Sequence, residues 1–133
     1  MVQPKVPAEM FFPDINFPMK NLWEIEKLED YIATPEGNEN FVRHLKTVGG
    51  HDAKDMVIRI LKQNFSNALA DICSWTGRKG NYEVGKLKQF DIMFATVHQS
   101  FNYTKKEFEM VVMDWLRHAK QRLLRENKYN NYV

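Results

Sequence analysis

From residue 21 onward, apolar residues recur every three or four positions, and this spacing is the feature that most limits the fold. Such spacing places side chains on one face of an α-helix, whereas a half-buried strand needs strict alternation, which appears convincingly nowhere in the chain. The first stripe runs from Leu22 to Ile32, and the last runs from Phe108 to Leu123 along one long closing helix. The sequence therefore predicts an all-α fold, a compact bundle of about five or six helices.

Residues that cap helix N-termini precede the apolar stripes, at Asn21, Thr34, Asp52, Ser66 and Thr104. Each can accept a hydrogen bond from a backbone N–H of the first turn. Thr104 with Glu107 has the spacing of a full capping box. Gly49-Gly50 is expected to end the second helix, because glycine adopts the left-handed conformation without a Cβ penalty.

Residues 1–20 contain four of the five prolines, which predicts an extended arm in place of a helix. The arm also carries apolar side chains that can cover the chain's own core or enter a partner's groove. The candidates for partner binding are Phe11, Phe12, Ile15 and Phe17. The expected organisation is an arm over 1–20, a single helical domain over 21–126 and a C-terminal tail over 127–133.

Charge is distributed unevenly along the chain, although the net charge is only +2. Residues 1–74 carry 8 basic and 11 acidic residues, and residues 75–133 carry 11 basic and 6 acidic residues. A basic second half favours an anionic partner. The single cysteine, Cys73, excludes an intrachain disulfide, fits a reducing compartment and is expected to be a buried thiol.

The stretch Trp75–Gly80, WTGRKG, interrupts the helical pattern and places two basic residues between two glycines. Glycines allow backbone N–H groups to join basic side chains around a phosphate. Arg78, Lys79, Lys86 and Lys88 are the candidate phosphate contacts of this segment. The ring of Trp75 is expected to pack in the core. The plain alternative for the basic residues is a solvated turn between two helices.

The closing helix supplies a second basic surface. At 100° per residue, Arg117, Gln121, Arg125 and Lys128 form one row, and His118 lies beside it. Arg117, His118, Arg125 and Lys128 are therefore candidates for extending a track along a nucleic-acid backbone. A row of this kind is also typical of a solvated helix end, where cations complement the helix dipole.

The sequence contains no motif of a common enzyme class: no G-x-G-x-x-G, no P-loop, no H-E-x-x-H and no G-x-S-x-G. The four histidines, His44, His51, His98 and His118, have no metal-ligand spacing with one another or with Cys73. No apolar run approaches the roughly 18 residues of a membrane-spanning helix. We expect no catalytic residue, cofactor, metal, small-molecule substrate or membrane partner.

Three segments carry a family resemblance: FPMKNLWEIEKLEDYI, the stretch from Leu45 to Val97, and FEMVVMDWLRHAKQRL. Together they resemble the animal domain of unknown function 4806, over about residues 17–123. The matching features are Phe17-Pro18, Gly49-Gly50, Asn67–Ala70, Trp75–Gly80 and Trp115–Lys120. Gly85 departs from the family pattern. The resemblance implies a C-terminal module of a longer protein and no stated activity, and a fainter similarity is to the helical, DNA-binding BEN domains.

Two functions remain open from the sequence. The first is a duplex-DNA-binding module of a nuclear, chromatin-associated protein of transcription regulation, which contacts phosphates through the basic turn and the closing helix. The alternative is a protein-interaction or homodimerisation module, which uses the apolar arm and can be cytoplasmic. The sequence does not show whether the turn and the closing helix share one face.

Overall fold

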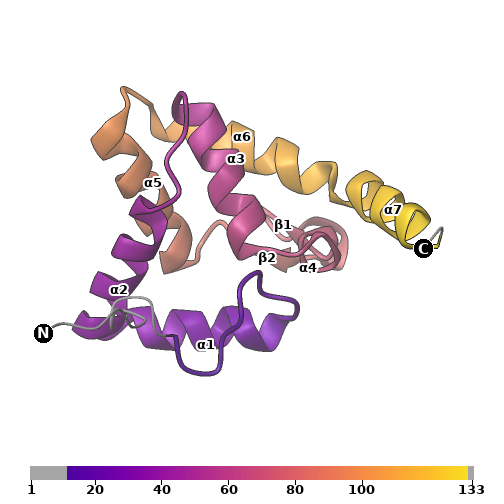
Figure 1. Cartoon of the computed structure of the whole chain (residues 1–133), viewed down its shortest axis with the longest axis horizontal. Helices are drawn as coiled ribbons and strands as arrows, with labels where there is room; N and C mark the ends of the chain where they lie inside the picture. The colour runs from indigo at the N-terminus through magenta and orange to yellow at the C-terminus, as the bar shows by residue number, and fades with distance from the viewer. Residues whose placement is uncertain (1–11, 132–133) are drawn as a thin grey trace, which may run out of the picture.

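The computed structural model describes residues 12–131, and most of these residues are helical (Figure 1). The helices are α1 (Leu22–Ile32), α2 (Pro35–Lys46), α3 (Ala53–Asn64), α4 (Asn67–Asp71), α5 (Lys88–Ser100), α6 (Lys105–Arg117) and α7 (Ala119–Asn130). A 3-10 turn, η2 (Arg78–Gly80), lies between the two short strands, β1 (Cys73–Ser74) and β2 (Tyr82–Glu83). The all-α class is confirmed, with seven α-helices in the described part of the chain.

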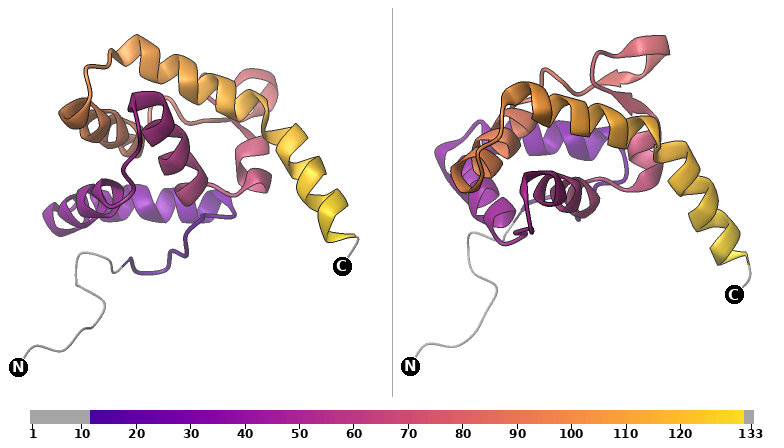
Figure 2. Two further views of the ribbon diagram at one scale, coloured as in Figure 1. Left: turned by 45° about the horizontal axis from the view of Figure 1, so that its top comes forward. Right: turned by 90° about the horizontal axis from the view of Figure 1, so that it is seen from above.

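The core forms where α1, α2, α3, α5 and α6 meet, and α3 lies between α5 and α6 (Figure 2). Its largest fully buried side chains include Phe41, Phe90 and Phe108, which come from α2, α5 and α6. Outside this centre, α4 and α7 pack on each other at one end of the molecule. Burial of one such side chain contributes roughly 1.5–3 kcal/mol, so the apolar stripes provide most of the driving force for folding.

The predicted N-caps are all confirmed. The side chains of Asn21, Thr34, Asp52, Ser66 and Thr104 each accept a hydrogen bond from the backbone N–H three residues further on. Thr104 and Glu107 form the full capping box. The start of α5 has no cap of its own, and Glu29 of α1 accepts bonds at 3.0 Å from the N–H groups of Lys88 and Gln89.

The closing helix is not continuous, and the prediction of a single long helix is wrong. The chain leaves the helical conformation at His118, with φ −96° and ψ 10°, and α7 then turns to pack on α4. Arg122 stabilises the new direction, because its guanidinium lies 3.9 Å from the centroid of the Trp115 ring and donates to Asn67 Oδ1 at 2.9 Å. Since α7 ends at Asn130, the first residues of the expected tail are helical.

The structure also contains two short stretches of β structure that the sequence pattern did not predict. Cys73 and Ser74 pair in parallel with Tyr82 and Glu83. A separate bridge joins Met19 to Phe65. Strands of two residues are too short to show alternation, so the expectation that the chain lacks strands is wrong for these positions.

The described part of the arm packs on the chain's own core. Phe12, Ile15 and Met19 are buried, and the Phe17 ring stacks on His44 at 4.4 Å between centroids. The arm is held by the buried carboxylate of Glu24, which accepts from the N–H of Asn16 at 3.1 Å and of Lys20 at 2.7 Å. Of the partner-binding candidates, Phe12 and Ile15 are therefore covered in this chain, and Phe11 lies outside the described residues.

His44 gives this arm contact a pH dependence. Its ring is buried beside Phe12, Phe17 and Phe41, and neither ring nitrogen makes a hydrogen bond of acceptable geometry. Burial lowers the pKa of His44 below its ordinary value of 6.5, although the nearby Asn64 side chain acts in the opposite direction. The folded chain therefore favours the neutral imidazole, while the unfolded chain takes up a proton at the ordinary pKa.

We expect the free energy of unfolding to be at its full value above the unfolded pKa and to decrease as the pH falls through about 6.5, because protonation favours the unfolded chain. Urea unfolding at about pH 7.5 and about pH 5.5 measures this loss. A His44→Gln variant should lose less stability across that interval, whereas His51→Gln, at an exposed histidine, should behave like the unsubstituted chain. An unchanged pH dependence in His44→Gln would assign the loss to other groups.

Candidate nucleic-acid interface

The basic turn is shaped by hydrogen bonds within the turn itself. Ser74 Oγ accepts from the N–H of Gly77 at 2.9 Å and of Arg78 at 3.0 Å. Gly77, Lys79 and Gly80 have φ of 79°, 55° and 79°, so the backbone turns sharply and the two basic side chains are exposed. The expectation that the amides of this turn join a phosphate site is not met at Gly77 and Arg78, because Ser74 already occupies them.

Trp75 anchors the turn on the core, as its sequence context predicts. Its half-buried ring meets the Phe90 and Phe108 rings edge-on, at 5.8 and 6.4 Å between centroids. The chain returns beside it at Gly85, whose N–H donates to the Trp75 carbonyl at 3.0 Å. A Cβ at Gly85 would lie 2.6 Å from that carbonyl oxygen and 2.8 Å from the ring, so glycine is required by the close approach.

The turn faces the junction of α6 and α7 across a hollow of about 650 Å³. We call this hollow the basic groove. Arg78 and Lys79 line it from the turn, and Arg117 and Lys120 line it from the junction. Asp71 is the acidic residue of the lining. The turn and the end of α6 therefore share one face, which the sequence left open.

The positive charge of the basic groove is only partly compensated. Lys120 Nζ lies 3.6 Å from Asp71 Oδ2, and Arg117 Nη1 lies 3.5 Å from Asp114 Oδ1. The Arg117–Asp114 pair is more than 60% exposed on both sides, and such pairs are worth about 0–1 kcal/mol, so an anion can displace it at little cost. Arg78 and Lys79 have no ion-pair partner within residues 12–131.

The floor of the groove includes Cys73, Met113 and Leu116. Cys73 is buried, as expected, and burial raises the pKa of its thiol to about 12. The thiol is therefore uncharged at neutral pH and is not an activated nucleophile. The groove offers cations and polar groups to a ligand.

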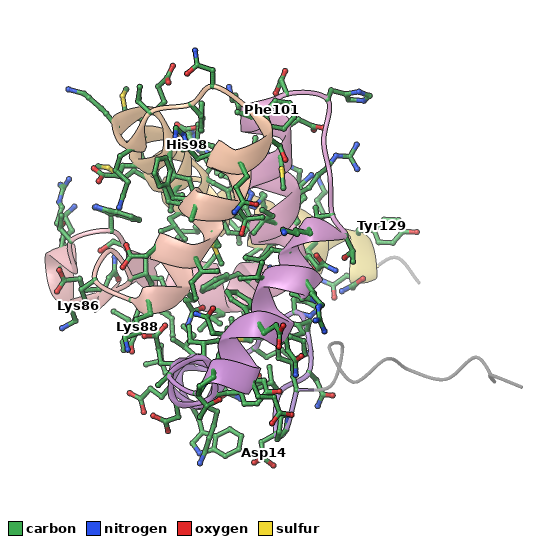
Figure 3. All side chains as sticks on the ribbon, turned by 90° about the vertical axis from the view of Figure 1, so that its left-hand side faces the viewer. Asp14, Lys86, Lys88, His98, Phe101 and Tyr129 are labelled. Carbon is green, nitrogen blue, oxygen red and sulfur yellow. The ribbon has the colours of Figure 1, made fainter. Side chains whose placement is uncertain are left out.

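Five of the predicted nucleic-acid contacts lie elsewhere. Lys86 forms a 3.7 Å pair with Glu83 and lines a second groove against α1, and Lys88 lies on the same side of the molecule (Figure 3). His118 is turned back toward its own helix, with Nδ1 2.8 Å from the Asp114 carbonyl oxygen. Arg125 and Lys128 follow the break at His118, so the expected row with Arg117 is interrupted.

Lys120 is the groove residue that sequence reasoning missed. It follows Arg117 by three positions, which makes the two neighbours on a helix surface, but the row of Arg117, Gln121 and Arg125 follows steps of four residues and leaves Lys120 out. Arg122 was missed as well, because its role depends on Trp115 and Asn67, which come from other elements. The sequence shows many basic residues after Trp115, but it does not indicate which of them lines the groove and which one fixes the direction of α7.

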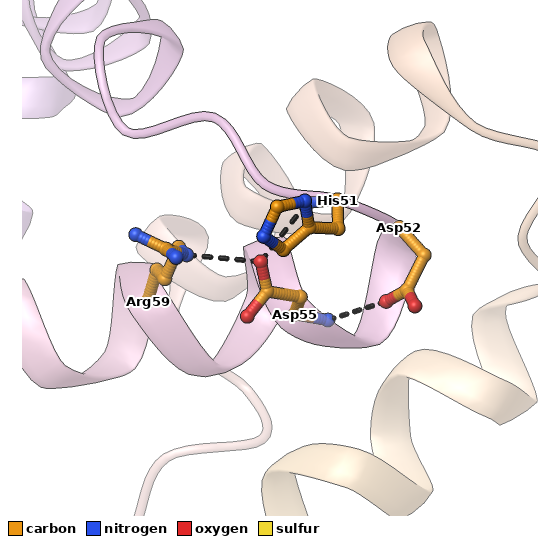
Figure 4. A network of polar contacts seen from close by, with 4 residues as sticks. All are labelled: His51, Asp52, Asp55 and Arg59. Carbon is orange, nitrogen blue, oxygen red and sulfur yellow. Dashed lines mark hydrogen bonds and ion pairs between the residues drawn. The ribbon is translucent and has the colours of Figure 1, made fainter.

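A second polar cluster, at the start of α3, is structural (Figure 4). The Asp55 carboxylate accepts from the N–H of His51 and from Arg59 Nε, both at 2.9 Å, and the Asp55 N–H donates to Asp52 at 2.8 Å. The bonds from His51 and Arg59 lower the pKa of Asp55, with the His51 N–H as the largest cause. Because these groups satisfy one another, the cluster holds the helix start and leaves no open site.

Residues 12–131 contain neither a candidate metal site nor a candidate membrane-spanning helix. No group of three or more His, Cys, Asp or Glu side chains could hold a metal ion there. Among the helices of the same residues, none combines the length and apolar character needed to cross a membrane. The basic groove and the second groove against α1 remain as the candidate surfaces.

Comparison with known proteins adds one match. A family model described as a domain of unknown function (DUF4806) matches residues 12–100. No curated protein and no solved structure matches the chain. The matched span contains residues 12–20 of the arm, the basic turn and α5, and it ends before α6.

Proposed function

This chain belongs to the DUF4806 family of domains of unknown function, and we propose that it is a non-enzymatic module that binds the phosphate backbone of duplex DNA in the nucleus. The observation that carries the proposal is the basic groove, where two segments far apart in the sequence bring four cations together. Arg78 and Lys79 lie within the span matched by the family model, and Arg117 and Lys120 lie beyond it. The proposed parent protein is associated with chromatin and takes part in the regulation of transcription.

Phosphate binding fits the energetics of the groove. The guanidinium groups of Arg78 and Arg117 can each form bidentate bonds with phosphate oxygens, and the two lysines act as point charges. Neutralising phosphates releases condensed counterions, so affinity falls as salt rises, with a slope of about −0.9 per contact. Four contacts predict a slope of about −3.6, which is a loss of about 150-fold between 50 and 200 mM salt.

The test is fluorescence anisotropy with a labelled random-sequence duplex over that salt range. In an Arg78→Ala/Lys79→Ala variant, we expect the slope to fall to about −1.8, so that the loss over the same range is only about 12-fold. Lys54→Ala/Lys106→Ala is the matched control, since it removes two exposed lysines outside the groove. Equal affinity and equal slope in the two double variants would show that the basic groove is not the contact surface.

A protein-interaction module is the second candidate, and the second groove favours it. This hollow of about 600 Å³ is lined by Leu22 and Glu26 of α1 together with Ile72, Tyr82 and Glu83. Ile72 is 46% exposed and Trp23, on the same helix as Leu22, is 53% exposed. Exposed apolar side chains beside a hollow are typical of interaction sites, and a cytoplasmic location would suit this function equally well.

Light scattering tests the self-associating form of this second function. A mass that rises with concentration, and that Ile72→Asp returns to the monomer value, would favour association through the second groove. A monomer mass at every concentration would exclude homodimerisation.

A further inference from the structure

We propose that α7 reads base edges in the major groove of the duplex whose backbone the basic groove holds, with Gln121, Arg125 and Lys128 as the reading residues. The inference rests on the proposed function and deepens it. It assigns to the chain a sequence preference, which phosphate contacts alone do not provide.

α7 is attached to the rest of the molecule through its first residues, from the buried Ala119 to the half-buried Leu123. Ala119 is buried, and Arg122 stacks on Trp115 while donating to Asn67 Oδ1 and, at 2.8 Å, to the Trp115 carbonyl oxygen. From Leu124 to Asn131 every residue is exposed. Figure 2 shows the consequence, because α7 leaves the body at an angle to α6 and its far end stands clear of the other helices.

The free part of α7 has suitable dimensions for a duplex groove. Residues 124–130 extend about 10 Å at 1.5 Å per residue. The major groove of B-DNA is about 12 Å wide and admits one α-helix. At about 3.4 Å per base pair, this length spans about three base pairs.

The side chains on the free face have the chemistry of base readers. Gln121, Arg125 and Lys128 are spaced i, i+4 and i+7, and helical geometry places them opposite the buried Ala119. Arginine and lysine donate to O6 and N7 of guanine, and glutamine forms two bonds with adenine. Leu124, 61% exposed, and Tyr129, 69% exposed, flank this row and can contact thymine methyl groups or sugars.

The positive charge of α7 and its connection to the basic groove favour DNA as the ligand of this helix. Glu126 is the only acidic residue of α7, which carries Lys120, Arg122, Arg125 and Lys128. Lys120 belongs both to α7 and to the basic groove, so phosphate contacts at the root of the helix and base contacts along it form one continuous surface.

The test is a selection of duplexes from a random library by the full chain, followed by anisotropy at one fixed salt concentration. We expect enrichment of a motif of about three base pairs, and at least about tenfold tighter binding of the selected duplex than of a random duplex. Gln121→Ala/Arg125→Ala should reduce this ratio of affinities to about one. Alanine is the best helix former, so α7 stays folded in this variant, which circular dichroism checks.

Arg78→Ala/Lys79→Ala serves as the comparison variant, because it should weaken both duplexes by a similar factor and keep their ratio. Random-duplex binding without any enrichment would overturn base reading by α7 and leave the proposed function standing. Enrichment that persists in Gln121→Ala/Arg125→Ala would overturn the assignment to α7. Binding to neither duplex would overturn both proposals.

Discussion

A Gly37→Ala variant is expected to lose at least about 3 kcal/mol of unfolding free energy, the upper range for overpacking a close contact. Gly37 is buried in the first turn of α2, where the chain has just reversed from α1. A Cβ at this position would collide with the Tyr31 carbonyl oxygen and would lie 2.9 Å from Cγ of the Tyr31 ring. Because the obstacle is backbone, no side-chain rotation relieves it.

The expected change in unfolding free energy is opposite in sign to the usual effect of this substitution in a helix. Replacing glycine by alanine inside a helix usually stabilises it by about 1 kcal/mol. Urea unfolding followed by circular dichroism measures the difference, and Asn38→Ala, at the exposed next position, is the matched control and should stay within about 0.5 kcal/mol. A Gly37→Ala chain as stable as the control would mean that α1 and α2 separate easily at this corner.

A Glu24→Ala variant is expected to lose about 3 kcal/mol and to release the arm from α1. The carboxylate accepts from the N–H groups of Asn16 and Lys20. Each amide left without a partner costs about 1–3 kcal/mol, and the negative charge at the helix N-terminus is lost as well. Met19, fully buried beside these bonds, loses its support at the same time.

Urea unfolding and limited trypsin digestion test this prediction together. Cleavage after Lys20 should be much faster in Glu24→Ala than in the unsubstituted chain, because the bonded segment opens locally. Glu26→Ala removes the same charge from an exposed position of the same helix, and it should leave both the stability and the cleavage rate nearly unchanged. Equal effects of the two substitutions would assign the role of Glu24 to charge alone.

The helix starts were predictable because their causes are local. Thr34, Asp52 and Thr104 each bond a backbone N–H three residues away, and that distance is visible in the sequence. The start of α5 was not predictable in this way. Its cap is Glu29, 59 residues before Lys88, and nothing near Lys88 indicates which distant carboxylate the fold will bring there.

The basic groove also has one part that local sequence predicts and one part that depends on distant residues. Residues 75–80 have the glycines of a sharp turn, and their charges could be identified without a structure. The residues that line the basic groove opposite Arg78 and Lys79 could not be predicted. They lie where α6 and α7 meet at His118, and the apolar spacing does not specify the angle between these helices. Helical spacing allows Arg117 to act with Lys120 or with Arg125, and only the fold shows that Arg117 and Lys120 meet the turn.

The sequence by itself determined the all-α class, the helix caps, the buried stripes and the exposed basic turn, because each depends on residues within about one or two helical turns. Only the tertiary structure decided that the arm packs on His44, that Glu29 caps α5 and that the turn shares a groove with Lys120. These contacts join residues far apart in the chain. Their geometry follows from how the helices pack together, which the local pattern of residues does not specify.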